Sequence, residues 1–373
     1  MKNHLEANNS CYIHIPFCNK ICSYCDFCKI YKDDKFVDKY LDALEKEIKS
    51  IYHKEVLDTI YIGGGTPSSL SINQLERLFN ILKIFNKSKN IEYTIEGNFD
   101  TTSKEKLALY KKAGINRLSF GLESINKNNL KLLERNANQK QVEDTIKFAK
   151  EMGFNNINVD LIYALPNETI DILEKDLDFI YSLNIEHISC YSLIIEDHTI
   201  LKINNIKNIS EDLDYEMYNF ICNKLKDNNY LHYEISNFSK ENYQSKHNSC
   251  YWKNNHYYGF GLGASSYVGN KRITNTRSIN KYLKENYILD IEELNILDTI
   301  EYEVILNLRR KEGINLKEFN NKYHQELKDV YDYEPLINKG LLVLDGNNLY
   351  IPEDKWYISN KIIVEILEGE KNG

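Results

Sequence analysis

The chain has 373 residues, of which 27% are charged and 42% hydrophobic, and its formal net charge is −8 at pH 7. This length suffices for one large α/β domain with a smaller appendage. The sequence shows no apolar leader, no run able to cross a bilayer and no basic stripe, so we expect a soluble cytoplasmic protein that does not bind nucleic acid.

The first predicted strand, Tyr12–Ile15, leads into a short loop rich in cysteine. Cys18, Cys22 and Cys25 are spaced C-x3-C-x2-C. Three thiolates this close together can bind three corners of a [4Fe-4S] cluster and leave the fourth iron open.

A structural zinc site is the alternative, because zinc takes four ligands and Cys28 or His14 can supply the fourth. The remaining thiols are scattered, which argues against a disulfide framework. They are Cys11, Cys190, Cys222 and Cys250.

Strands and helices are predicted to alternate after this loop. Apolar residues at helical spacing indicate a helix over 37–51, and Ser71 with Gln74 predicts a capping box for the next helix. Further strands are predicted at Thr59–Ile62, Ile91–Glu96, Asn116–Phe120, Ile157–Ile162 and His187–Tyr191. Counting the first strand, these make six β/α units. We therefore predict an α/β fold, an open partial (β/α)6 TIM-like barrel with its chemistry at the C-terminal ends of the strands.

The pattern changes near residue 200. A long helix is predicted over 213–225 and a strand at Tyr233–Ile235, whereas 237–266 has no periodicity and predicts a long irregular loop. Beyond Asp298 we expect two or three helices, a hairpin turning at 345–348 and a closing helix, a small winged-helix-like α+β domain. The expected division is 1–200 for the barrel, 201–297 for its extension and 298–373 for the C-terminal domain.

Polar residues at the predicted strand ends suggest a ligand pocket. Gly63–Gly65 lets a ligand touch backbone, although a tight turn explains it equally well. Glu96 and Asp160 each end an apolar strand and suit ribose hydroxyls or an ammonium group, and Arg135 can hold a carboxylate. Taken individually, each of these three residues is more typical of a salt-bridged residue at the rim of the barrel. Together they indicate a pocket for S-adenosylmethionine (SAM) beside an iron–sulfur cluster.

Several motifs resemble a known family, the radical SAM enzymes related to oxygen-independent coproporphyrinogen III dehydrogenase. They lie at Tyr12–Phe27, Gly63–Pro67 (GGGTP), Asn116–Ser124 (NRLSFGLES), Asn158–Pro166 and Tyr233–Phe238. The resemblance covers nearly the whole chain. Within this family, His247–Trp252 matches the HNxxYW motif of members that are heme chaperones.

The resemblance implies that Cys18, Cys22 and Cys25 ligate a [4Fe-4S] cluster whose open iron binds SAM. The residues at family positions that contact SAM are Tyr12, Tyr24, Gly64, Gly65, Thr66, Glu96, Glu123, Arg135 and Asp160.

The chain departs from the family at three places. Glu123 stands where glutamine is usual, and 96–100 reads EGNFD where the family tends to E-x-N-P. Phe27 occupies the position of the dehydrogenase's extra cysteine, while Cys28 follows it. We predict that Cys28 is not a ligand, because a fourth thiolate would close the cluster against SAM.

Two functions follow from the resemblance. In the first, the protein is a chaperone that binds heme, with His247 as an iron ligand, and delivers it to a heme-accepting apoprotein. An electron donor, and peripheral membrane contact through the recipient, would accompany this role. In the second, it is an oxygen-independent coproporphyrinogen III dehydrogenase that decarboxylates propionates by radical chemistry. Three features favour the chaperone: the HNxxYW motif, the short length of the segment before Tyr12, and the presence of Phe27 in place of the extra cysteine.

Each reading has an alternative. Packing of the His247 loop onto the barrel is the alternative to heme ligation, and a zinc-stabilised barrel without redox function is a third interpretation of the chain.

Overall fold

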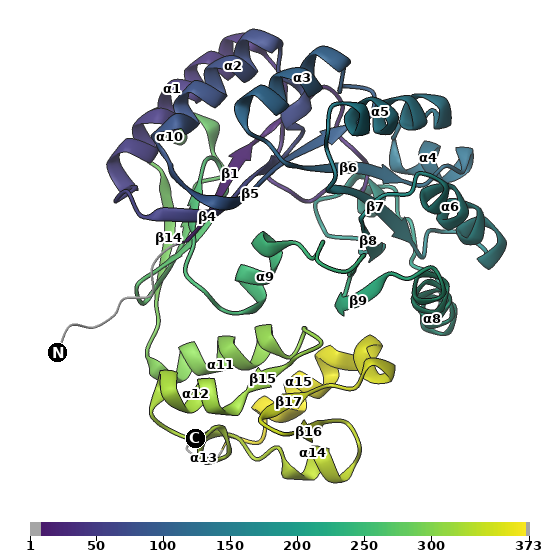
Figure 1. Ribbon diagram of the computed structural model, residues 1–373, viewed down its shortest axis with the longest axis vertical. Helices are drawn as coiled ribbons and strands as arrows, with labels where there is room; N and C mark the ends of the chain where they lie inside the picture. The colour runs from purple at the N-terminus through teal and green to yellow at the C-terminus, as the bar shows by residue number, and fades with distance from the viewer. Residues whose placement is uncertain (1–8, 371–373) are drawn as a thin grey trace.

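The computed structural model describes residues 9–370 and contains the predicted β/α units. Six parallel strands carry them: β1 (Ser10–Ile15), β4 (Val56–Gly64), β5 (Asn86–Asn98), β6 (Arg117–Glu123), β7 (Ile157–Tyr163) and β8 (His187–Ser192). The sheet curves, and helices cover its outer face (Figure 1). These helices are α1 (Asp34–Ile51), α2 (Ile72–Ile81), α3 (Lys104–Ala113), α4 (Lys127–Leu133), α5 (Gln139–Glu151), α6 (Ile170–Ser182) and α8 (Glu211–Asp227). The predicted open α/β barrel is confirmed.

Local sequence explains where individual helices begin. Ser71 accepts a hydrogen bond from the Gln74 amide at 3.3 Å, and the Gln74 side chain accepts one from the Ser71 amide at 2.9 Å, so the predicted capping box is present. In α1 the apolar stripe faces the sheet and is buried. It comprises Val37, Leu41, Leu44 and Ile48.

The sheet extends beyond the six units by three strands, of which only β9, expected at Tyr233–Ile235, was predicted. β11 (Tyr258–Phe260) adds in parallel beside β1, and β10 (Asn237–Ser239) and β9 (Leu231–Glu234) add antiparallel beyond β8. Helix α9 (Lys246–Trp252) lies on the inner side of the curved sheet, toward the C-terminal part (Figure 1). The expected irregular loop over 237–266 is therefore wrong. Strands β10 and β11 are only three residues long, too short to show an alternating pattern, and each pairs with a strand distant in sequence, β8 and β1 respectively.

A second sheet and the C-terminal elements complete the fold. The sheet has the order β12 (Ser265–Val268), β13 (Lys271–Asn275), β14 (Ile288–Glu293). The C-terminal part contains α11 (Ile296–Asn307), β15 (Ile314–Asn315), α12 (Leu316–Tyr323), α13 (Leu327–Val330), α14 (Glu334–Asn338), β16 (Val343–Asp345), β17 (Asn348–Tyr350) and α15 (Ser359–Leu367). Strands β16 and β17 form the predicted hairpin, with Leu344 opposite Leu349. Within residues 9–370, no helix is both long and apolar enough to span a membrane.

Candidate functional site

The cysteine loop is anchored at both ends of its span. Pro16 ends β1, but the chain pairs again at once, because β2 (Phe17–Cys18) runs parallel to β3 (Ile30–Tyr31). The Ile30 amide donates to the Pro16 carbonyl at 2.8 Å, and the Lys32 amide donates to the Cys18 carbonyl at 2.9 Å. The cysteine residues are thus held in one closed loop at the C-terminal end of β1.

The glycine run after β4 packs directly against this loop. A Cβ on Gly65 would stand 2.9 Å from the Cys18 sulfur, and one on Gly64 would stand 2.6 Å from the His14 ring. A Cβ on Gly63 would meet the Glu96 carboxylate at 2.8 Å. Larger residues here would push the Cys18 sulfur, the histidine or the carboxylate out of place, so the glycines set the shape of the site.

Cys18, Cys22 and Cys25 all lie in this loop, near enough to one another for their charges to interact. Burial raises the pKa of all three thiols, that of Cys18 to about 11, and charge on either of the other two thiols would raise the pKa of Cys18 further. Two polar groups face the sulfurs: the Thr66 hydroxyl lies 3.5 Å from that of Cys18, and Arg135 Nη1 lies 3.7 Å from that of Cys22. A soft, three-sulfur donor set with hydrogen-bond donors around it fits an iron–sulfur cluster, whose binding displaces the thiol protons.

The two residues considered as a fourth zinc ligand have other contacts. Both ring nitrogens of His14 are engaged, Nδ1 with the Tyr12 hydroxyl at 2.9 Å and Nε2 with the Cys28 carbonyl at 2.6 Å. Burial raises the pKa of the Cys28 thiol, and Arg277 hydrogen-bonds to it and opposes that effect. Among residues 9–370, no three His, Cys, Asp or Glu side chains are arranged to hold a single metal ion, and this holds for Cys18, Cys22 and Cys25 as well.

A buried ion pair lies beside the trio. Arg135 Nε donates to Glu123 at 2.8 Å, and the Tyr24 hydroxyl donates to the other Glu123 oxygen, also at 2.8 Å. Burial raises the pKa of the Glu123 carboxyl, against the opposing effect of Arg135. Glu123 sits at a bulge in β6 with a φ of 64°, and Glu134 ends α4 in the left-handed region, which directs the chain into Arg135. The Glu123 carboxylate, which stands where the family has glutamine, is thus paired with the Arg135 guanidinium.

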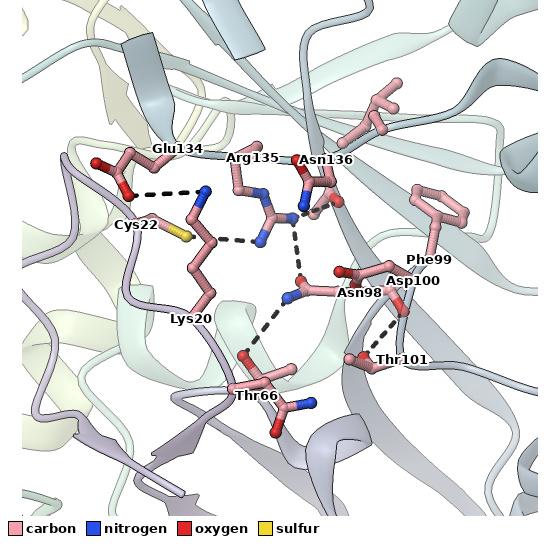
Figure 2. A pocket seen from close by; sticks show the side chains of 14 residues that line it. Lys20, Cys22, Thr66, Asn98, Phe99, Asp100, Thr101, Glu134, Arg135 and Asn136 are labelled. Carbon is pink, nitrogen blue, oxygen red and sulfur yellow. Dashed lines mark hydrogen bonds and ion pairs between the residues drawn. The ribbon is translucent and has the colours of Figure 1, made fainter. Parts of the chain in front are cut away.

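A pocket opens between the cysteine loop and the ends of β5 and β6 (Figure 2). Arg135 reaches across it, donating from Nη2 to the Asn98 side chain at 3.0 Å and to the Gly121 carbonyl at 2.7 Å. Lys20 and Glu134 form an ion pair of 3.6 Å at its rim. The predicted residues Cys22, Thr66 and Arg135 line this pocket.

Glu96 lies near the end of β5 and Asp160 lies within β7, and both carboxyls are bonded to neighbouring side chains or backbone. Glu96 accepts from the Tyr61 hydroxyl at 2.7 Å and from the Gly64 amide at 3.0 Å, and burial raises its pKa to about 7. Asp160 accepts from the Asn158 side chain at 2.8 Å, and burial likewise raises its pKa. Neither forms a salt bridge within residues 9–370, so neither is the salt-bridged rim residue that was the alternative, and contact of these carboxyls with a ligand stays a prediction.

His247 lies in α9 rather than in a loop, and it is buried against β4. Nδ1 is 2.7 Å from the Thr59 hydroxyl, Nε2 is 2.8 Å from the Tyr251 hydroxyl, and the ring stacks on Tyr61 at 5.1 Å. The helix is held by Glu92, whose carboxylate accepts the backbone amide of His247 at 3.0 Å. Burial lowers the pKa of His247 to about 3. The structure thus shows the packing arrangement that was the alternative to heme ligation.

Sequence reasoning missed the residues that support the site. Tyr61, Asn98 and Asn158 each hold a predicted group in place. All three lie on predicted strands or at their ends and alternate with buried apolar residues. That alternation is the signal that could have assigned them to the inner face.

Comparisons with known proteins agree with the architecture. A family model described as the radical SAM superfamily matches residues 12–180, and one described as the HemN C-terminal domain matches residues 297–354. The chain is 37% identical to the heme chaperone HemW of Lactococcus lactis, covering 99% of this chain and 100% of that protein. It is also 37% identical to the heme chaperone HemW of Bacillus subtilis, covering 95% and 97%.

Among solved structures, coproporphyrinogen III oxidase (HemN) from Escherichia coli, described as a radical SAM enzyme, superposes with a TM-score of 0.84. The two chains are 23% identical, and the match covers 96% of this chain and 90% of that one. This likeness establishes the fold and not the activity.

Proposed function

The chain belongs to the HemW family of heme chaperones within the radical SAM superfamily, and from this we propose that it binds heme and transfers it to a heme-requiring apoprotein. The identity extends over the full length of the relatives, so the proposal covers the whole chain. The dehydrogenase alternative has in its favour the fold likeness to HemN and the match of residues 297–354 to the HemN C-terminal domain, whereas the relatives of 37% identity are heme chaperones.

The proposed cofactors are a [4Fe-4S] cluster, SAM and heme. Cys18, Cys22 and Cys25 would hold the cluster, which when bound supplies single electrons and an open iron for SAM. The residues proposed to contact SAM are Tyr12, Tyr24, Gly64, Gly65, Thr66, Glu96, Glu123, Arg135 and Asp160.

The observation that carries the proposal is the neighbourhood of the three thiols and the Glu123–Arg135 pair. Arg135 contacts both Cys22 and Glu123, so its guanidinium can hold an anionic group next to the cluster position. Glu123 and Tyr24 fix the orientation of this guanidinium and keep it from turning toward solvent.

We propose His247 as a heme ligand that becomes available only when α9 loosens. Its Nε2 must leave the Tyr251 hydroxyl before it can bind iron. SAM at Glu96 would act on the same region, since Tyr61 both donates to Glu96 and stacks on His247. The cofactor pocket and this histidine are thereby in contact through one side chain.

We further propose a cytoplasmic location, an electron donor that reduces the cluster, and membrane contact only through the recipient. The test of the function is a transfer assay with anaerobically reconstituted protein. Heme-loaded protein should convert a heme-free apoprotein into its holo form, and the same preparation should leave coproporphyrinogen III unchanged. Conversion of coproporphyrinogen without heme transfer would reverse the assignment.

A further inference from the structure

A buried cation lies at the start of β6 without a hydrogen-bonded partner among the described residues. Arg117, on β6, is 1% exposed, yet within residues 9–370 its guanidinium forms no ion pair and its Nε has no hydrogen-bond partner. A buried charge without a hydrogen-bonded partner is costly, and orphaned buried donors are rare. This arginine therefore requires an explanation that the fold alone does not give.

A second orphaned group lies beside it. Thr94 pairs with Arg117 in the register of β5 and β6, so both side chains project from the same face of the sheet. Thr94 is fully buried, and its hydroxyl also has no hydrogen-bond partner among the described residues. Two adjacent donors thus lack an acceptor at the same height in the barrel.

The surrounding groups have hydrogen bonds of their own. His187 is bonded through Nδ1 to Asn158 at 2.6 Å and through Nε2 to the Tyr233 hydroxyl at 2.7 Å. Burial lowers the pKa of His187 and of His247, and the positive charge of Arg117 lowers both further, so the guanidinium is near both rings. The guanidinium is therefore enclosed by groups from several elements, none of which accepts from it.

Two carboxyls share this interior, but each is bonded elsewhere. Glu96 accepts from Tyr61 and Gly64, and Asp160 accepts from Asn158. Their charges interact favourably with Arg117, but neither carboxyl accepts a hydrogen bond from its guanidinium. A planar fork with a neighbouring hydroxyl matches a carboxylate, which takes two or more donors at once.

We propose that Arg117 and Thr94 form a carboxylate-binding site inside the barrel and that, on the proposed chaperone function, the carboxylate is a heme propionate. The propionates are the anionic groups of heme. They sit on flexible arms and can enter a polar interior that the porphyrin ring cannot. The methionyl carboxylate of SAM has the same chemistry and is the alternative source.

The test compares heme with heme dimethyl ester, in which both propionates are masked, by absorption titration of wild type, Arg117→Gln and Arg117→Lys. Wild type should bind heme on the order of 10-fold more tightly than the ester. Arg117→Gln should bind both equally, at the level of the ester, and Arg117→Lys should retain part of the preference. Because the native cation is unpaired, ligand-free Arg117→Gln should unfold at the same or a higher temperature than wild type.

Four outcomes overturn the inference. Equal affinity of wild type for heme and ester rules out propionate recognition while leaving the chaperone function intact. If Arg117→Gln loses affinity for heme and for the ester by the same factor and also unfolds at a lower temperature, Arg117 has a structural role only. A loss of SAM affinity in Arg117→Gln with the preference for heme over ester unchanged assigns the site to SAM. Absence of heme binding to wild type refutes both this site and the proposed function.

Discussion

Arg135 donates from Nη1 to the Cys22 sulfur across 3.7 Å. This contact joins the end of α4 to the cysteine loop, two segments far apart in the sequence. It places a permanent positive charge against a predicted cluster ligand, and the same guanidinium is held by Glu123 on its other side. The ion pair and the thiols therefore form one site.

Arg135→Gln should weaken SAM binding and leave the cluster in place. A charge-assisted hydrogen bond contributes about 1.5–3 kcal/mol, so affinity should fall roughly 10- to 100-fold. Equilibrium dialysis of reconstituted protein measures this directly. Arg77→Gln is the control, because Arg77 forms its ion pairs with Asp38 and Asp42 on the outer surface.

The Arg135→Gln variant leaves Glu123 buried and unpaired, which itself destabilises the fold. The double variant Arg135→Gln/Glu123→Gln removes this complication and should recover stability without recovering SAM affinity. Wild-type affinity in the double variant would show that Arg135 does not hold the ligand.

Cys28→Ala should retain a full complement of iron and sulfide after anaerobic reconstitution, whereas Cys25→Ala should not. Gly263 packs against the Cys28 side chain, and Arg277 hydrogen-bonds to its thiol. Iron and acid-labile sulfide analysis, with the absorption spectrum, distinguishes the two variants. A cluster lost on substitution of Cys28 would make this thiol a ligand after all.

Tyr251→Phe should raise heme affinity if His247 is an iron ligand. The substitution removes the hydroxyl that engages Nε2 at 2.8 Å and keeps the ring that packs edge-on against the histidine. One neutral hydrogen bond contributes about 1 kcal/mol, so the gain should be on the order of 5-fold. Absorption titration with heme measures the affinity. His247→Ala is the matched control, in which the heme affinity should fall. An unchanged affinity in both variants would remove His247 from the heme site.

Glu47 predicts a specific dependence of stability on pH. It is fully buried in α1, accepts from Gly261, Asn275 and Tyr282, and burial raises its pKa from 4.5 to about 7. The folded state therefore keeps a proton that the unfolded state loses above pH 4.5, so the free energy of unfolding falls as pH rises from 4.5 to 7. From 1.36 kcal/mol per pKa unit, this fall is about 3 kcal/mol.

Urea unfolding of wild type and Glu47→Gln at pH 5 and pH 8 isolates this contribution. Glutamine cannot ionise, so the variant should lose less stability between the two pH values than wild type does. The same loss in both proteins would show that Glu47 titrates normally in the folded state.

The sequence predicted those parts of the fold that depend on nearby residues. The cysteine spacing, the capping box of Ser71 and Gln74 and the hairpin that pairs Leu344 with Leu349 are all set within a few positions. The six parallel strands could be predicted from apolar runs. A strand that is buried on both faces has apolar residues in succession, so it can be recognised without an alternation of polar and apolar residues.

Features that depend on distant partners could not be predicted. Strand β11 exists because Tyr258 pairs with Cys11, and α9 is held by Glu92 of β5. The orphaned Arg117 is invisible in the sequence, since arginine at the start of a predicted strand usually reaches solvent. Its missing partners can be recognised only once all the surrounding strands are in place.

Every proposed role of the site requires Cys18, Cys22 and Cys25 to hold a cluster with one open iron. Mössbauer spectroscopy of protein reconstituted with ⁵⁷Fe, with and without SAM, tests it most directly. We predict a [4Fe-4S] spectrum in which one iron site shifts when SAM binds. A spectrum unchanged by SAM, or protein that takes up a single zinc ion and no cluster, would contradict the account.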